Sequence, residues 1–202
     1  MAAGSPSPTP LNVLAGIAGQ GGTPSLAWFA PLGTALPADA STALANSYLT
    51  AGYCTEAGLT ISTATNTTDI AAYGVSVPVR TLITSQTQTG QIAFLETNPV
   101  TQAIYRRLPL PGQTGGVTPT AGGNLSMTEG QARVQSYVAV FTATDGVNLI
   151  RKVCPNIQIT DKTDEVISQA AAITYGVTFT AYPDSTGTSI YTYMVVPNLA
   201  TA

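Results

Sequence analysis

The 202-residue sequence contains no histidine. Without an imidazole, Ser-His-Asp and Cys-His catalysis in their usual forms are excluded, and the commonest metal ligand and proton shuttle is missing. The ten acidic residues offer carboxylates for glycoside hydrolysis, but they are scattered over predicted loops and are not spaced to face one cleft. The sequence therefore predicts no catalytic residues, and we expect a protein that is not an enzyme.

Charge is also scarce. Lys, Arg, Asp and Glu together make up 8% of the chain, and Thr, Ser, Asn, Gln and Gly take over the polar role. The net charge is −3 and no basic patch occurs, which argues against sequence-independent binding of nucleic acid. Since a soluble monomer normally relies on charge to stay apart from its neighbours, this composition indicates a subunit of an assembly or a Thr-rich extracellular β protein.

Cysteines and long apolar runs are few. Cys54 and Cys154 stand a hundred positions apart without the CxxC spacing of a zinc or redox site, so reduced, buried thiols are favoured and a disulfide remains the alternative. No apolar run reaches the roughly 18 residues that a membrane span requires, and no signal peptide is recognisable. We expect synthesis in the cytoplasm and no insertion into a membrane.

Binding motifs for cofactors are missing as well. The Gly-rich stretches 19–22 and 112–123 lack the Gly-Lys-Ser/Thr ending and the GxGxxG spacing of phosphate loops. Asp161, Asp164 and Glu165 offer hard oxygen ligands, but they lack the Gly-punctuated spacing of a dedicated calcium site. The sequence therefore predicts neither a cofactor nor a bound metal.

The clearest local signals lie in residues 76–107. Two runs with alternating apolar residues flank a polar turn, which predicts a long β-hairpin inside this stretch. Asn98 is a good N-cap and Pro99 fits the first helical position, so a short helix should follow. One stripe of this helix is expected to pack on the core through Val100, Ala103 and Ile104.

The C-terminal half reads as β structure. Runs 134–142 and 147–153 flank an Asp-Gly turn, and residues 173–182 alternate apolar with Thr or Gly. The last run, 190–196, is apolar on both faces, which is easier to explain when a neighbour covers one of them. The predicted fold is mainly β, a β-sandwich or barrel of two packed antiparallel sheets with one short flanking helix.

The chain is long enough for one core. We expect residues 1–22 to form a flexible N-terminal arm and residues 23–202 to form a single β domain. Within that domain, 30–60 is predicted to be a long loop and 109–127 a flexible surface loop, because neither sustains a hydrophobic period.

Several short pieces resemble one protein family by their order and spacing. They are W-F-A-P-x-G-T-x-L-P at 28–37, A-G-Y-x-x-E-x-G-L-T at 51–60, D-I-x-x-Y-G at 69–74, Val79-Arg80, and the LETNP junction at 95–99. Together they resemble the major tail tube proteins of long-tailed bacteriophages, especially those infecting actinobacteria. The resemblance covers residues 27–104 well and the C-terminal half only by strand order. The sequence departs from the family pattern at Tyr73, where Trp is expected, and at Ala57, where an acid is common.

The resemblance implies a structural virion protein of the tail, assembled in the host cytoplasm. Its subunits would form six-fold rings, stacked into a tube whose joined sheets make a continuous barrel around a lumen for DNA ejection. The implied partners are further copies of the chain and other tail proteins, such as tape measure, terminator and distal tail proteins. DNA would pass through without specific binding.

The resemblance also implies that the long loop 30–60 reaches the adjoining ring. The apolar residues expected at subunit contacts are Leu32, Leu36, Pro37, Leu44, Tyr48, Leu49, Tyr53 and Leu59, with Tyr191, Tyr193 and Val195 of the last strand. Two alternatives stay open. The loop can be an irregular lid over the subunit's own core, and the protein can be a β-sandwich attachment or decoration module on the virion surface, binding glycan or protein.

Overall fold

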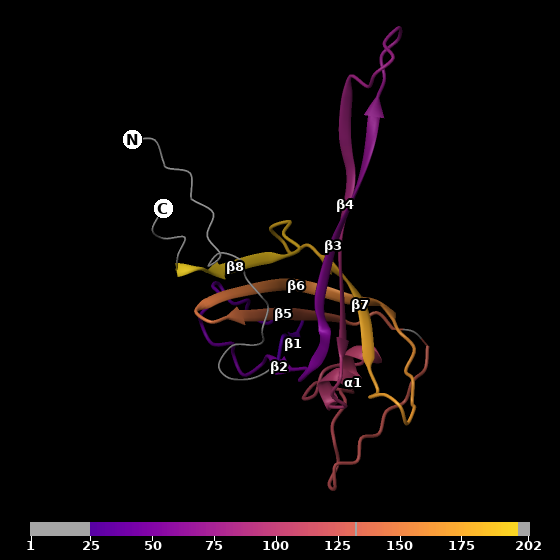
Figure 1. Ribbon diagram of the computed structural model, residues 1–202. Helices are drawn as coiled ribbons and strands as arrows, with labels where there is room; N and C mark the ends of the chain where they lie inside the picture. The colour runs from indigo at the N-terminus through magenta and orange to yellow at the C-terminus, as the bar shows by residue number, and fades with distance from the viewer. Residues whose placement is uncertain (1–24, 132, 198–202) are drawn as a thin grey trace.

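A computed structural model describes residues 25–131 and 133–197, so the expected arm at 1–22 lies outside the described residues (Figure 1). The strands, in chain order, are β1 (Ala27–Pro31), β2 (Leu49–Thr50), β3 (Cys54–Ile70), β4 (Arg80–Phe94), β5 (Ser136–Asp145), β6 (Asn148–Lys162), β7 (Tyr175–Tyr182) and β8 (Tyr191–Val195). One helix, α1 (Pro99–Tyr105), follows β4. The mainly β class with one short helix is confirmed.

The strands form one antiparallel sheet in the order β2-β1-β5-β6-β7-β4-β3, with β8 also pairing β6. The sequence predicts two packed sheets, whereas here one continuous sheet curls over. Phe29 of β1 meets Phe94 of β4 with ring centroids 6.0 Å apart, and Phe141 of β5 stacks on Phe179 of β7 at 5.5 Å. The edge strands β2 and β3 are joined by residues 51–53 alone, so the chain itself brings the two edges together.

The main core fills the inside of this curl. Strand β7 shows how it is built, because Tyr175, Val177, Phe179 and Ala181 are buried at every second position. The helix begins where the sequence predicts, since the Asn98 side chain accepts a hydrogen bond from the Thr101 amide at 2.8 Å. The helical residues in the same core are Val100, Ala103 and Ile104.

The position of the long hairpin differs from the prediction. The polar residues predicted to form its turn lie inside the continuous strand β4 (Arg80–Phe94). The partner of β4 is β3, which runs through the polar stretch 63–68. The hairpin prediction within 76–107 is therefore wrong. The connection between the two strands is 71–79, and the polar strand residues gave no hydrophobic period because neither of their faces is buried.

The C-terminal strands follow the sequence more closely. The β5–β6 hairpin is confirmed, with Gly146 and Val147 between the paired residues Asp145 and Asn148, and Gly146 takes a φ of 59°. The segment 109–127 contains no helix or strand, yet it is not simply a solvated loop. Its residues Leu110 and Val117 are buried, and Leu125 and Met127 are partly buried on the main core.

Candidate assembly surfaces

The paired strands β3 and β4 extend well beyond the rest of the molecule (Figure 1). Strand β7 leaves β4 after the pair Gln88–Ala181, so residues 80–87 of β4 pair with β3 alone. Almost every residue in 62–87 is exposed. At a rise of about 3.3 Å per residue, this part projects by roughly 25 Å before its turn. We call residues 62–87 the extended hairpin.

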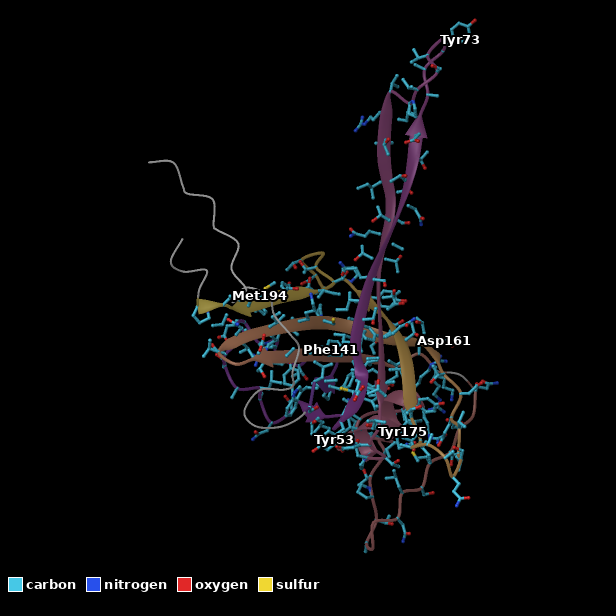
Figure 2. The ribbon with its side chains drawn as sticks, viewed as in Figure 1. Tyr53, Tyr73, Phe141, Asp161, Tyr175 and Met194 are labelled. Carbon is cyan, nitrogen blue, oxygen red and sulfur yellow. The ribbon has the colours of Figure 1, made fainter. Side chains whose placement is uncertain are left out.

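The tip of the extended hairpin is apolar. Tyr73 is exposed at its far end (Figure 2), and it is accompanied by a group of exposed aliphatic side chains. That group is Ile70, Val75, Val77, Val79, Leu82 and Ile83. An isolated two-stranded hairpin is at best marginally stable in water, and an exposed apolar group of this kind marks a contact surface. The outer edge of β3 also lacks a neighbouring strand within the described residues, so its backbone groups can pair with another chain.

The segment 32–48, where subunit contacts were expected, instead covers the subunit's own sheet. A second cluster lies on the face opposite the main core and is formed by Ala30, Tyr48, Val138, Val140 and Val153. Leu36 and Leu44 pack against it, while Leu49 and Leu59 pack against the main core. These four residues and Tyr48, which is 5% exposed, thus pack on their own subunit, and their role as subunit contacts stays a prediction. Pro37 is half-buried, and Leu32 and Tyr53 are exposed.

A buried arginine holds this lid in place. Arg151 of β6 is fully buried, and its Nη1 donates to the backbone carbonyls of Asp39 and Thr42, both at 2.9 Å. Tyr48 adds a bond from its hydroxyl to the Ala35 carbonyl at 2.9 Å, and burial raises the pKa of Tyr48 to about 12. These bonds satisfy the carbonyls of Ala35, Asp39 and Thr42 from the same subunit, as irregular backbone against a core requires.

Strand β8 also covers the face of the sheet that carries the second cluster. Tyr191 and Tyr193 stack in parallel with centroids 6.3 Å apart and pack against the second cluster. Tyr191 also donates to the Asp184 carboxylate at 2.7 Å; bonds from Thr186 and Tyr191 hold the pKa of Asp184 well below its ordinary value. Both tyrosines therefore cover their own sheet. The exposed side chains on this strand include Met194, at 59%, and Val195, at 38%.

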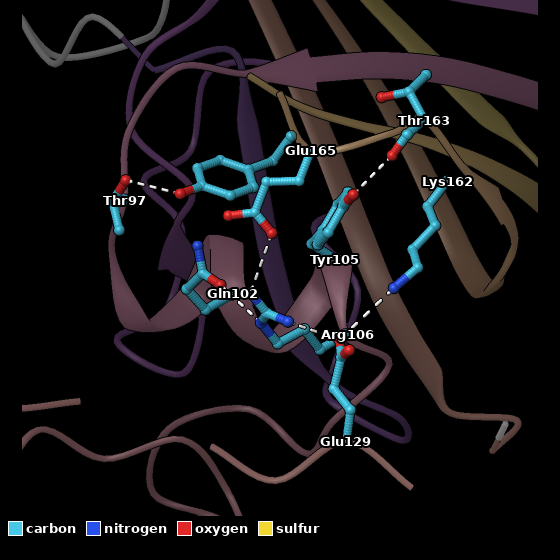
Figure 3. Close-up of polar contacts among 9 residues, drawn as sticks. Thr97, Gln102, Tyr105, Arg106, Glu129, Lys162, Thr163 and Glu165 are labelled. Carbon is cyan, nitrogen blue, oxygen red and sulfur yellow. Dashed lines mark hydrogen bonds and ion pairs between the residues drawn. The ribbon is translucent and has the colours of Figure 1, made fainter. Parts of the chain in front are cut away.

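Charged side chains gather at the C-terminal end of α1 (Figure 3). Arg106 pairs with Glu129 at 2.7 Å and with Glu165 at 3.2 Å, and Lys162 approaches Glu129 at 3.5 Å. The same ammonium lies 4.8 Å from the ring centroid of Tyr105. These contacts join the helix to the loops before β5 and after β6. No local pattern in the sequence signals these partners of Arg106.

The helix ends in an unusual way at Arg107. The amide of Arg107 bonds to the Ile104 carbonyl at 3.2 Å, and the next amide, Leu108, bonds to Ala103 at 2.8 Å. This is the bond pattern of a Schellman cap, whose left-handed residue is usually glycine. Arg107 occupies that position with a φ of 56°, the one positive φ among the described non-glycine residues. Its conformation is costly for a side chain with a Cβ.

The acidic side chains and the two cysteines form no metal site within the described residues. Within 25–131 and 133–197, no three Cys, Asp or Glu side chains come together so that they could hold a metal ion. Both cysteines are free thiols, and burial raises the pKa of Cys154 to about 12. In the same part of the chain, no helix is long and apolar enough to cross a membrane.

Comparison with known proteins identifies the family of this chain. The family model described as phage tail tube protein matches residues 17–200. The chain belongs to the phage tail tube protein family. Among solved structures, the virion of a native gene transfer agent particle matches with 10% identity, a TM-score of 0.38, and coverage of 75% of this chain and 92% of the other. No curated protein matches the sequence.

Membership of the tail tube family makes the protein a structural component of the virion tail and not an enzyme. It also implies that the chain assembles with itself and with other tail proteins. For such a protein the functional sites are surfaces. The extended hairpin is the most exposed of them, and sequence reasoning missed it because an alternating polar strand pair without a buried face resembles a loop.

Proposed function

We propose that this tail tube protein is the repeating subunit of stacked hexameric rings, which form the conduit for DNA ejection into the host. The single observation that carries the proposal is the extended hairpin. The hairpin projects an apolar tip and an unpaired strand edge away from the core. In a single subunit both would stay exposed to water and would not stabilise the fold. In stacked rings, the tip of each subunit would be covered by the ring above or below.

The hairpin thus takes the role that the resemblance gave to residues 30–60. Head-to-tail contacts generate closed rings when the rotation between subunits closes, and the same chain can then repeat along the tube. The low charge of the protein supports this arrangement, because few like charges oppose contact between copies.

The charge of the protein also supports passage of DNA. With a net charge of −3 and many neutral hydroxyls, the chain offers phosphate groups little to bind. We further propose that the tube ends meet tape measure, terminator and distal tail proteins, that assembly takes place in the host cytoplasm, and that the phage infects an actinobacterium.

A shortened hairpin tests this function. Asn66 and Ser85 are cross-strand partners, so replacing residues 67–84 by Asn-Gly joins them through a two-residue turn without changing the register below. We expect a folded protein with an unchanged thermal midpoint that forms rings but no tubes in negative-stain micrographs.

A full-length variant, Tyr73→Ser, provides the matched comparison because it removes only the most exposed aromatic ring, and it should weaken stacking while leaving rings intact. Tubes of normal length from the shortened protein would show that the hairpin is not the stacking contact. A folded wild-type protein that stays monomeric would instead favour an attachment or decoration module.

A further inference from the structure

A positively charged pocket lies beside the C-terminal end of α1. It has a volume of about 530 Å³ and lies between the helix end, residues 115–117, residues 126–131 with Arg133, and the end of β6. Four of the seven Lys and Arg residues of the chain line it. They are Arg106, Arg107, Arg133 and Lys162, and the one acid in the lining is Glu129. In a protein with a net charge of −3, this concentration of cations is a local reversal of charge.

Two of these cations have no acidic partner within the described residues. Arg106 and Lys162 pair with glutamates, whereas the structure shows no ion pair to Arg107 or Arg133 among residues 25–131 and 133–197. Arg107 donates Nη2 to the Thr160 carbonyl at 3.1 Å, and its buried Nε has no hydrogen-bond partner. Arg133 is exposed, and the fork of a guanidinium matches the two oxygens of an incoming carboxylate.

The remaining walls favour a peptide over a nucleic acid. Tyr105, Leu108, Val117 and Met127 also line the pocket and give it an apolar side. Nucleic acid phosphates require cations spread along a track, whereas these cations are confined to one concavity that also contains Glu129. The fitting ligand is a short segment with one carboxylate next to an apolar side chain.

The β5–β6 turn of the protein has this chemistry. It presents Asp145 next to Val147, whose side chain is 74% exposed. The turn lies at the beginning of β6, and Lys162 of the pocket lies at the end of the same 15-residue strand. The turn and the pocket accordingly lie toward opposite ends of β6, and Figure 1 shows the turn at the end of the sheet away from α1. A contact between opposite ends of identical subunits is the head-to-tail kind that closes a ring.

We propose that the cationic pocket of each subunit receives the Asp145–Gly146–Val147 turn of the neighbouring copy in the same ring. This contact rests on the proposed function, since it needs rings, but it is distinct from the stacking contact of the extended hairpin. Asp145 approaches Arg133 and Arg107 of the neighbour, and Val147 packs on the apolar side of the pocket.

A charge-swap experiment on the full chain tests the contact. Arg133→Glu and Asp145→Lys each place like charges across the interface, and the double variant restores opposite charges between copies. We expect each single variant to raise the concentration at half assembly by about tenfold or more in sedimentation velocity. The double variant should assemble at least about threefold better than either single variant, but short of the wild type, because the introduced lysine still faces Arg107. Lys152→Glu, on β6 and outside both the pocket and the extended hairpin, is the matched control and should form rings normally.

Each outcome decides between the possibilities. Thermal melts identify any variant that fails to fold, and Arg133 is exposed, so its variant should melt like the wild type. If wild type and single variants assemble equally well, the pocket contact is wrong while the tube function stands. Weakened single variants without recovery in the double variant would overturn the pairing with Asp145. If the wild type binds a DNA duplex and Arg133→Glu abolishes that binding with unchanged assembly, the pocket is a phosphate site. A wild type without rings would remove both proposals.

Discussion

Replacing Arg151 by methionine should release the lid 32–48 from the second face of the sheet. The buried guanidinium is the donor for the carbonyls of Asp39 and Thr42, at 2.9 Å each, and it approaches the Thr142 hydroxyl at 3.4 Å. Methionine keeps a long, flexible apolar stem but offers no donor. The lid then has either to leave these carbonyls unpaired or to move into water.

The expected loss follows from these bonds. A hydrogen bond to a charged group contributes about 1.5–3 kcal/mol, so two such bonds give roughly 3–6 kcal/mol. Part of this is offset because methionine avoids the cost of burying a charge. We expect the free energy of unfolding to fall by about 3 kcal/mol, which corresponds to a drop in Tm of roughly 6–12 °C for a chain of this size.

Thermal denaturation and limited proteolysis measure this effect together. Arg151→Met should melt earlier and be cut within 32–48 under conditions in which the wild type is resistant. Lys152→Met is the matched control: this neighbouring side chain has a bond to the Thr192 hydroxyl at 3.2 Å in an exposed setting, so its loss should cost little. Equal melting and equal cleavage of the two variants would refute the assignment of the segment as a lid.

Three further predictions concern the core, the helix and acid stability. Gly90→Ala places a Cβ 2.2 Å from the ring of Phe179 and should lower the free energy of unfolding by about 1–3 kcal/mol in chemical denaturation. The control Gly130→Ala has no atom within 4 Å of its Cβ and should be neutral, so equal denaturation midpoints of the two variants would contradict the packing of Gly90 on Phe179. Ile104→Asp buries a charge at a fully buried core position and should cost at least about 3 kcal/mol and leave the protein insoluble, so a soluble variant with an unchanged Tm would show that the helix faces elsewhere. A hydrogen bond from the Thr42 hydroxyl is the main reason that the pKa of Asp39 is lowered to about 2, compared with about 3.9 in the unfolded chain. Its contribution to the free energy of unfolding is therefore present above pH ~4 and is lost as the pH falls towards 2. Asp39→Asn should flatten this part of the Tm profile, and a variant profile as steep as the wild type's would exclude Asp39 as the cause.

Sequence reasoning succeeded where one face of an element is buried. Strand β7 alternates between buried apolar residues and Thr, and the β5–β6 hairpin has a glycine in its turn, so both could be located from local pattern. The helix could be placed because Asn98 and Pro99 mark its start independently of packing.

Other features depend on tertiary contacts that leave no local pattern. The extended hairpin has no buried face, so its Thr-rich strands show no hydrophobic period. The lid is irregular and is held by a buried Arg151, a residue type that sequence reasoning places on the surface. The cationic pocket combines residues from three distant segments, and nothing in the sequence brings Arg133 and Lys162 together.

Negative-stain electron microscopy of the purified full-length protein over a series of concentrations tests the central claim most directly. The account predicts annular particles of uniform diameter that lengthen into tubes as the concentration rises, because the extended hairpin of each ring finds its cover in the next. Small globular particles at every concentration, from protein that melts cooperatively and is therefore folded, would contradict it.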